Sequence, residues 1–309
     1  MKMRQNNKKP ILGGQAIIEG VMIKSPSHVT MAVRSKDNIL FKSEKINTKK
    51  ASKIFFVRGI VNLYDMLIYG TKAIIWSSQQ QEYDGKEMTK TEIMLTMMLS
   101  VTLVIGIFIV LPYFLTSLTG VREQSSPVAF NLLDGIIRVI FFLTYLYLIS
   151  LLKDVRVLFQ YHGAEHKAIH CYEANKPLKI ENIKPFSPIH PRCGTSFIMI
   201  VFLISIIVFS FVPGTVRLII PKLFQMNIFI QKSILFFTRI LLIPVIAGIS
   251  YEILRLNTVH SNNVLMKVIN FPGMLIQKIT TKEPEEKQIE VAIASLKKAL
   301  EAEGISTNY

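Results

Sequence analysis

Four long apolar runs restrict most strongly what this chain can fold into. They extend over residues 93–115, 132–152, 197–212 and 234–254, and the third is the shortest. A helix needs about 20 apolar residues to cross a hydrocarbon core of about 30 Å, so each run predicts a transmembrane helix. Charged residues make up 18% of the chain, below the roughly 25% of soluble domains. The sequence therefore predicts an α-helical polytopic membrane protein.

Lysine and arginine are distributed unevenly around these runs. The segments before the first run, between the second and third, and after the fourth carry 30 of them, whereas the two other loops carry 4. Because positive residues stay on the cytoplasmic side, we expect both termini and the segment 153–194 to be cytoplasmic. The net charge of +15 then indicates loop topology and contact with anionic lipid. Specific binding of nucleic acid is not expected.

Residues 1–48 predict a small β-rich unit on the cytoplasmic side. Gly13-Gly14 suits a turn with positive φ. Apolar residues alternate with others in 29–33, ahead of a Lys-Asp-Asn turn at 36–38, which predicts a hairpin. Glu19 stands between apolar neighbours, and it is either a carboxylate on a strand surface or a site residue.

Residues 49–92 predict a helix followed by a linker. The apolar residues of 49–78 recur at helical spacing, but three charged residues among them, including Arg58, argue against a span. An interfacial or core-packed helix is the better interpretation. The stretch 82–92 is polar and predicts a linker to the transmembrane region 93–254.

Ionisable residues occur within the predicted spans. Asp134 and Arg138 are four residues apart, so they can pair on one helix face. Arg239 and Glu252 lie in the fourth run. Such residues mark functional sites by default, although those near a span end also extend to the interface by snorkelling.

Residues 255–309 predict two further cytoplasmic elements. The segment 264–280 is typical of a membrane-surface segment, which we expect to break at Pro272-Gly273. An amphipathic helix follows with Thr281 as its N-cap. We expect its apolar stripe to pack against a cytoplasmic layer that also contains the β-rich unit and the loop 153–194. The stripe consists of Ile289, Ala292, Ile293, Leu296 and Leu300.

The histidines and cysteines are concentrated in one short segment. Four of the six histidines and both cysteines lie in the stretches YHGAEHKAIHCYE (161–173) and HPRCGT (190–195). His162-x-x-Glu165-His166 has the spacing in which two histidines bind a metal ion and a glutamate handles the proton of a water. On a helix with about 100° per residue, both histidines share one face with His170 and Glu173.

The donor types predict a divalent metal, with zinc or another late ion favoured over magnesium, because nitrogen and sulfur ligands are mixed. Glu165 is the expected general base. The alternative is structural: histidines beyond a span often cap a helix or lie at the lipid head groups, and reduced cysteines often fill cores. The predicted metal ligands are His162, His166, His170, Glu173, His190 and Cys193.

We expect the second span to run on past Leu152 toward Tyr161. His162 would then lie near the cytoplasmic membrane surface. Glu252, at the end of the fourth span, would be within reach of it, and so would Glu19 if the β-rich unit packs over the loop.

Six blocks of the sequence resemble those of a bacterial membrane-protein family usually called YqhQ-like. The resemblance implies an integral protein of the bacterial plasma membrane, in a family catalogued as a domain of unknown function and sometimes as a predicted metal-dependent enzyme. It places Glu19, Cys171 and Glu252 in family blocks as additional candidate site residues. The blocks are GGQAIIEGVMIKSP, FFVRGIVNLYDMLIYGTKAI, YHGAEHKAIHCYE, HPRCGTSF, AGISYEILR and TTKEPEEKQIEVAIASL.

Two functions are consistent with these features. The first is a metal-dependent membrane enzyme that hydrolyses or transfers a group on a lipid, polyprenyl or peptide substrate at the cytoplasmic interface. The second is a non-enzymatic scaffold or accessory factor for membrane-protein insertion or envelope assembly, with a structural metal or none. Its basic cytoplasmic face would suit anionic lipid or a membrane protein complex.

Overall fold

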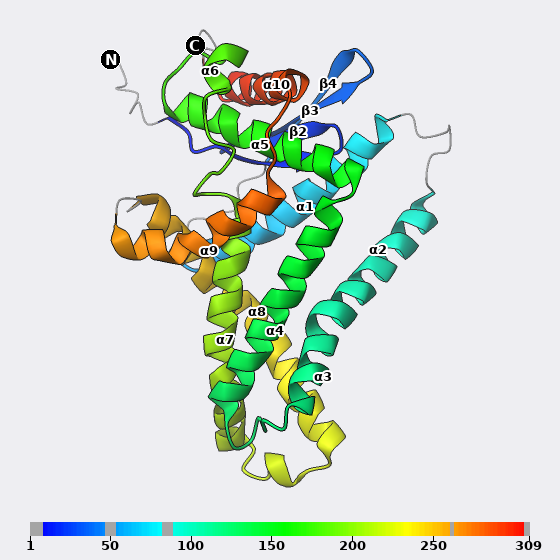
Figure 1. Ribbon diagram of the computed structural model, residues 1–309, viewed down its shortest axis with the longest axis vertical. Coiled ribbons are helices and arrows are strands. Elements are labelled where there is room, and N and C mark those ends of the chain that lie inside the picture. The colour runs from blue at the N-terminus through cyan, green and yellow to red at the C-terminus, as the bar shows by residue number, and fades with distance from the viewer. Residues whose placement is uncertain (1–8, 47–53, 82–88, 260–262, 306–309) are drawn as a thin grey trace.

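The computed structural model describes residues 9–46, 54–81, 89–259 and 263–305, and it is mostly helical (Figure 1). Its strands are β1 (Gly13–Ile17), β2 (Gly20–Lys24), β3 (His28–Ser35) and β4 (Asn38–Lys45). Its helices are α1 (Val57–Gln79), α2 (Lys90–Ile105), η2 (Gly106–Val110), α3 (Leu111–Leu118), α4 (Pro127–Ser150), α5 (Lys153–Glu173), α6 (Ile180–Ile183), α7 (Gly194–Ile219), η3 (Leu223–Gln225), α8 (Ile228–Val259), α9 (Val264–Thr280) and α10 (Glu286–Ala302). The sheet, α5, α6 and α10 form a unit at one end of a helical bundle, which we call the head.

The predicted β-rich unit is a four-stranded antiparallel sheet in the order β1-β2-β3-β4. The hairpin is confirmed, because Ser35 pairs with Asn38 across the turn. The prediction of a turn at Gly13-Gly14 is wrong, because both residues are paired within β1. The tight turn instead follows Ile17, where Glu19 adopts a φ of 50°. Glu19 therefore occupies a strained turn position and not the surface of a strand.

Both faces of the sheet are buried, because successive residues of a strand point to opposite sides. Val21 and Ile23 of β2 join a core shared with α5 and α10, whereas Met22 packs toward α1. The predicted stripe of the last helix lies in the first core, where Ile289, Ala292, Leu296 and Leu300 are at most 1% exposed and Ile293 is partly buried. The expected packing of the sheet, the 153–194 segment and the last helix is confirmed.

The helix predicted for the histidine stretch is confirmed, because α5 occupies the first half of the segment 153–194. The predicted continuation of the second span toward Tyr161 is wrong. Helix α4 ends at Ser150, and Leu152 takes an extended conformation before α5 starts. Figure 1 shows α5 crossing the end of the bundle at a steep angle to α4. This change of direction places α5 under the sheet.

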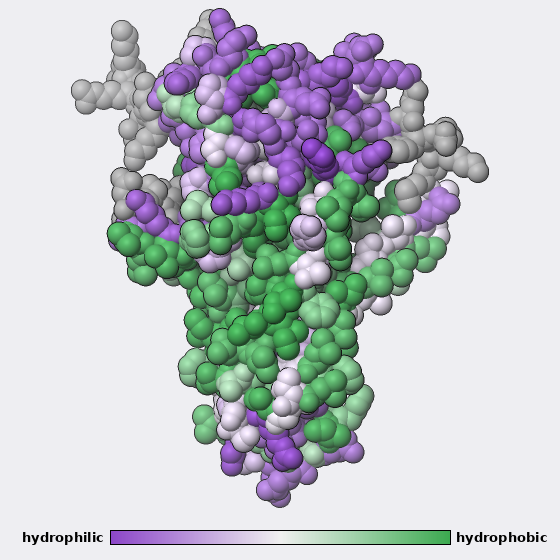
Figure 2. All heavy atoms as spheres, viewed as in Figure 1, coloured by the Kyte–Doolittle hydropathy of each residue, from purple (hydrophilic) through white to green (hydrophobic). Residues whose placement is uncertain are grey.

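Four helical segments are long and apolar enough to cross a membrane: 91–118, 127–150, 194–219 and 228–256. The third segment, 194–219, has 26 residues, so the predicted run 197–212 was too short at both ends. Figure 2 shows that the visible face of the bundle is hydrophobic between the hydrophilic head and a hydrophilic opposite end.

Three charged residues of these helices, Asp134, Arg138 and Arg239, have partners within the bundle. Arg138 donates from Nε to Asp134 Oδ2 at 2.8 Å, which confirms the predicted pair. It also donates from Nη1 to the Phe108 carbonyl in the π-helical turn η2, where the regular backbone ladder is interrupted. Arg239 donates to Glu123 at 2.7 Å and to Asn131 at 2.9 Å.

Helix α9 lies across the end of the bundle, below the head (Figure 1). It is one continuous helix through Pro272, so the predicted break is wrong. Its apolar face is exposed at Val268, Phe271 and Leu275. Thr281 is the C-cap of α9 and not the N-cap of α10, whose N-cap is Glu285 in a capping box with Gln288.

Two predictions near the linkers are modified. The predicted helix 49–78 corresponds to α1, which starts at Val57, and residues 47–53 lie outside the described part of the chain. The predicted linker 82–92 lies outside the described residues up to position 88. After that point Thr89 already caps α2, because it forms a capping box with Glu92.

Candidate metal centre

Helix α5 is buried along the stretch that carries the histidines. Ala164 and Ala168 face the core of the head, whereas His162 and His166 lie one turn apart on another face. The helix ends where Asn175 adopts a φ of 57° and the Lys176 N–H bonds back to the Cys171 carbonyl.

Backbone carbonyls fix the orientation and the tautomer of both histidines. His162 donates from Nδ1 to the Thr280 carbonyl at 2.8 Å, and His166 donates from Nδ1 to the Pro188 carbonyl at 2.6 Å. In the neutral imidazole the proton therefore stays on Nδ1, and each Nε2 has a lone pair that can accept a hydrogen bond or bind a metal ion. Burial lowers the pKa of His166, which favours the neutral form that binds metal.

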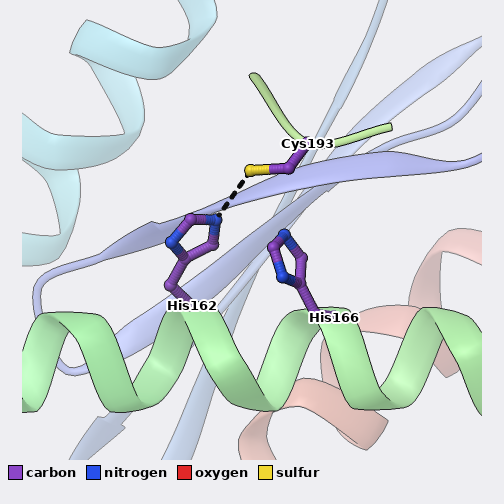
Figure 3. Close-up of side chains that lie close together, drawn as sticks. All are labelled: His162, His166 and Cys193. Carbon is purple, nitrogen blue, oxygen red and sulfur yellow. Dashed lines mark hydrogen bonds between the residues drawn. The ribbon is translucent and has the colours of Figure 1, made fainter. Parts of the chain in front are cut away.

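The two Nε2 atoms face a sulfur atom from a distant part of the chain. Figure 3 shows both rings pointing toward Cys193, whose Sγ lies 3.2 Å from His162 Nε2. Cys193 is the N-cap of α7, and its sulfur accepts bonds from the N–H and hydroxyl of Thr195. These contacts fix the position of the sulfur at the N-terminus of α7.

These three donors fit a divalent metal ion. Their ligand atoms all lie within 4.8 Å of one another. A tetrahedral zinc ion with bonds of about 2.0 Å to nitrogen and 2.3 Å to sulfur separates the two donors by roughly 3.5 Å, close to the 3.2 Å found for His162 and Cys193. The carbonyl partners on Nδ1 are those that metal-binding histidines ordinarily have. We call His162, His166 and Cys193 the triad.

The other three predicted ligands form a separate group of His170, Glu173 and His190. This group fits a metal less well, because its carboxylate is held in an ion pair and the buried Nε2 of His190, which has no hydrogen-bond partner among the described residues, carries a proton. His190 Nδ1 accepts the backbone N–H of Arg192, which leaves the proton on Nε2. Glu173 forms an ion pair with Arg192. His170 donates from Nε2 to the Ile189 carbonyl, and burial lowers its pKa to about 4.

Glu165 lies beside the triad. Its Oε2 is 3.6 Å from His166 Nε2, and its side chain is 5% exposed. Burial raises the pKa of this carboxyl group, although the nearby His162, His190 and Arg192 oppose the effect. A carboxyl group with a raised pKa can exchange protons near neutral pH. The glycine at position 14 makes room for it, because a Cβ there would lie 3.0 Å from Glu165 Oε1.

The three additional candidates have other positions. Glu19 accepts a hydrogen bond from the Tyr161 hydroxyl at 3.1 Å, so it supports the helix just before His162. Cys171 is fully buried in the core of the head, and burial raises the pKa of its thiol. Both cysteines are free. Glu252 does not reach the triad, because both of its carboxylate oxygens bind Arg58 and one also accepts the Phe56 N–H.

Sequence reasoning missed the part of α9 that supports the site. Gln277 is fully buried and binds both backbone groups of His190: its Oε1 accepts the N–H at 2.8 Å, and its Nε2 donates to the carbonyl at 3.0 Å. Thr280 supplies the carbonyl that holds His162. The available signal was the buried polar face of this helix, where Asn270 and Gln277 are seven residues apart.

The triad lies on the wall of a cavity of about 910 Å³. Residues of β1, α1, α5, α7 and α8 line this cavity, and they include Glu165 and Arg192. A metal ion held by the triad would therefore keep one side open to a second molecule.

Comparisons with known proteins give a family. The model of a family described as "Protein of unknown function (DUF1385)" matches residues 54–302, which include α1, α5 and the triad. The chain is 34% identical to a protein of Bacillus subtilis (strain 168) described as "Uncharacterized protein YqhQ", over 98% of this chain and 96% of that protein. No solved structure matches the chain. The resemblance noted in the sequence is thus confirmed, and the chain belongs to the DUF1385 family.

Proposed function

We propose that this protein is a metal-dependent membrane enzyme that catalyses hydrolysis or group transfer at the junction of the head and the bundle. One observation carries the proposal: two histidines held as Nδ1–H tautomers present their free nitrogens to Cys193 on the wall of a cavity. Structural zinc sites are closed by four protein ligands, whereas catalytic sites have three and an open position. The triad has the second arrangement.

The residues of the site have distinct roles in this proposal. His162, His166 and Cys193 hold the ion, which when bound supplies a Lewis acid and lowers the pKa of water. Glu165 accepts a proton at Oε2 from the attacking water and returns it to the leaving group. Gln277 and the Thr280 carbonyl keep the segments around the site in place.

We also propose a membrane topology. The four apolar helices cross the bilayer, and the head and both termini lie in the cytoplasm, because 30 of the Lys and Arg residues belong to the segments on that side. The test is a green fluorescent protein fused to the C-terminus and, separately, inserted after Gly120. Fluorescence is expected only from the fusion at the C-terminus, because green fluorescent protein does not fold correctly when it is exported across the membrane in an unfolded state. The reverse pattern would contradict the topology.

Replacing Glu165 with glutamine is expected to lower turnover by about 100-fold or more, because a positioned general base contributes that much. The metal content should stay at the wild-type level, since Glu165 is not part of the triad. The measurement is hydrolysis of a panel of p-nitrophenyl carboxylic and phosphoric esters by the detergent-purified protein, beside metal analysis of the same samples.

The matched control is Asp154→Asn, a change of the same chemistry in the exposed first turn of the same helix, outside the triad and the cavity lining. It should keep both metal and turnover. A metal-containing wild type whose turnover equals that of Glu165→Gln would contradict catalysis. A structural metal in an accessory factor would then be the better explanation.

A further inference from the structure

The cavity beside the triad lies between the head and the bundle, and its lining combines polar and apolar side chains. On the side of the head, His162, Glu165 and Arg192 contribute polar groups. On the side of the bundle, Phe197 in the first turn of α7 and Leu254 near the end of α8 contribute apolar groups. A ligand that fills this space must therefore be amphipathic.

The apolar side of the cavity is continuous with the outer surface of the bundle. Ile198, near the start of α7, lines the cavity and is 37% exposed. Ile74 of α1 also lines the cavity and is 47% exposed. Because both side chains are apolar and partly open, an apolar chain would leave the cavity between α1 and α7.

The charges around the cavity favour an anionic head group. Lys24 and Asp65 are 3.9 Å apart, so their charges offset each other. Arg192 lines the cavity and carries a guanidinium with five donors. Its ion pair with Glu173 offsets its charge but uses only part of these donors, so the others can bind a second anion. A divalent ion at the triad would balance the negative charges of a Cys193 thiolate and of an ionised Glu165. Guanidinium groups and divalent cations both bind phosphate well.

We infer that the cavity binds a membrane lipid with an anionic phosphate head group, which lies between Arg192 and the triad while the hydrocarbon chain extends past Ile198 into the bilayer. This inference rests on the proposed function, because an ion at the triad supplies part of the attraction for the head group. It gives the enzyme a substrate class: a phosphate-bearing lipid that enters sideways from the membrane.

The test is isothermal titration of the metal-containing, full-length protein in detergent with dihexanoyl phosphatidate. Saturable binding of one lipid is expected. Inorganic phosphate should bind at least 10-fold more weakly, because it lacks the apolar part. Dihexanoyl phosphatidylcholine should also bind at least 10-fold more weakly, because its head group carries no net charge. Arg192→Gln should weaken phosphatidate binding about 10-fold, which is the usual effect of losing one charged hydrogen bond.

Two tryptophan variants of α7 separate the cavity from the general surface. Ile198→Trp should weaken phosphatidate binding at least 10-fold, because it fills the outlet. Leu203→Trp is the matched control: Leu203 is 43% exposed on the same helix and does not line the cavity, so binding should be unchanged. Should Ile198→Trp misfold, as judged by thermal unfolding, Leu254→Trp tests the same space from α8.

Several results would overturn the inference: no saturable phosphatidate binding in protein that contains metal, equal binding of inorganic phosphate, or equal loss in the Ile198→Trp and Leu203→Trp variants. Failure of the proposed function looks different. Protein that contains no metal but still binds phosphatidate, with the Ile198→Trp effect, would retain the lipid site and refute the enzyme.

Discussion

Protein purified without chelators or metal-affinity resin is expected to contain about one equivalent of zinc, iron or manganese, and the His162→Ala/His166→Ala variant none. The double substitution removes two of the three donors, and a lone cysteine does not retain a divalent ion through purification. The measurement is elemental analysis of both samples at equal protein concentration.

The matched control is the His170→Ala/Glu173→Gln variant, which removes an imidazole and a carboxylate from the same helix. It should keep the metal, because His170 and Glu173 are held by Ile189 and Arg192 and lie outside the triad. Loss of metal from the control variant alone would show that the ion is bound by the group of His170, Glu173 and His190 instead of the triad. Absence of metal from the wild type would refute the metal centre.

Replacing Gly163 with alanine is expected to have the largest effect of any change that leaves all donors in place. A Cβ at this position would lie 2.1 Å from the Lys282 carbonyl oxygen, so the segment after α9 must move away from α5. That segment is held by a 2.9 Å bond from the Lys282 N–H to the Phe159 carbonyl and carries Thr280, the partner of His162. Overpacking of this kind costs roughly 1–3 kcal/mol of folding stability.

Metal affinity should fall as well, by about 10- to 100-fold, because the partner that orients a ligand is displaced. The measurements are the thermal unfolding midpoint and a competitive titration with a zinc-binding dye. Gly194→Ala is the control: Gly194 adjoins Cys193, but a Cβ there would have no neighbour within 4 Å. Equal unfolding midpoints and metal affinities for Gly163→Ala and the wild type would show that the segment is not clamped to α5.

Much of the fold could be predicted because it depends on local patterns. The apolar runs are the four long helices, and the alternation in 29–33 is strand β3. The apolar stripe of the last helix predicted that it would pack on the sheet and the 153–194 segment. In each case the residues that carried the pattern are the residues that become buried.

The errors arose where distant contacts decide the local structure. The change of direction between α4 and α5 depends on the extended conformation of Leu152, and apolar periodicity continues through that point. Pro272 suggested a break, but α9 continues because it packs on the first turn of α7, where a Cβ on Gly273 would lie 2.5 Å from Ser196 Cα. Thr281 has a side chain typical of an N-cap, but the N-cap of α10 is Glu285, which forms a capping box with Gln288.

The sequence predicted which residues carry donor atoms for a metal, but it did not predict how these atoms are arranged in space. The spacing of His162 and His166 on one helix face was readable in the sequence, and so was the closeness of Cys193. The division of six donors into two groups was not, because it depends on which ring nitrogen already bonds to a backbone group. Glu252 was misassigned for a related reason: its partner Arg58 lies in another helix, and no spacing rule relates the two residues.

The head is built from segments near both ends of the chain, so it can be completed only late in translation. Its core joins residues near the start of the chain, such as Val21, to residues near the end, such as Leu296 and Leu300. All four long helices leave the ribosome before α9 and α10 do, so the bundle can insert while the head is still incomplete. The Thr280 carbonyl reaches His162 only after translation has passed the last long helix. On the proposed topology and function, a chain that stops early would therefore insert its helices without completing the site, and the nascent enzyme would stay inactive until its synthesis ends.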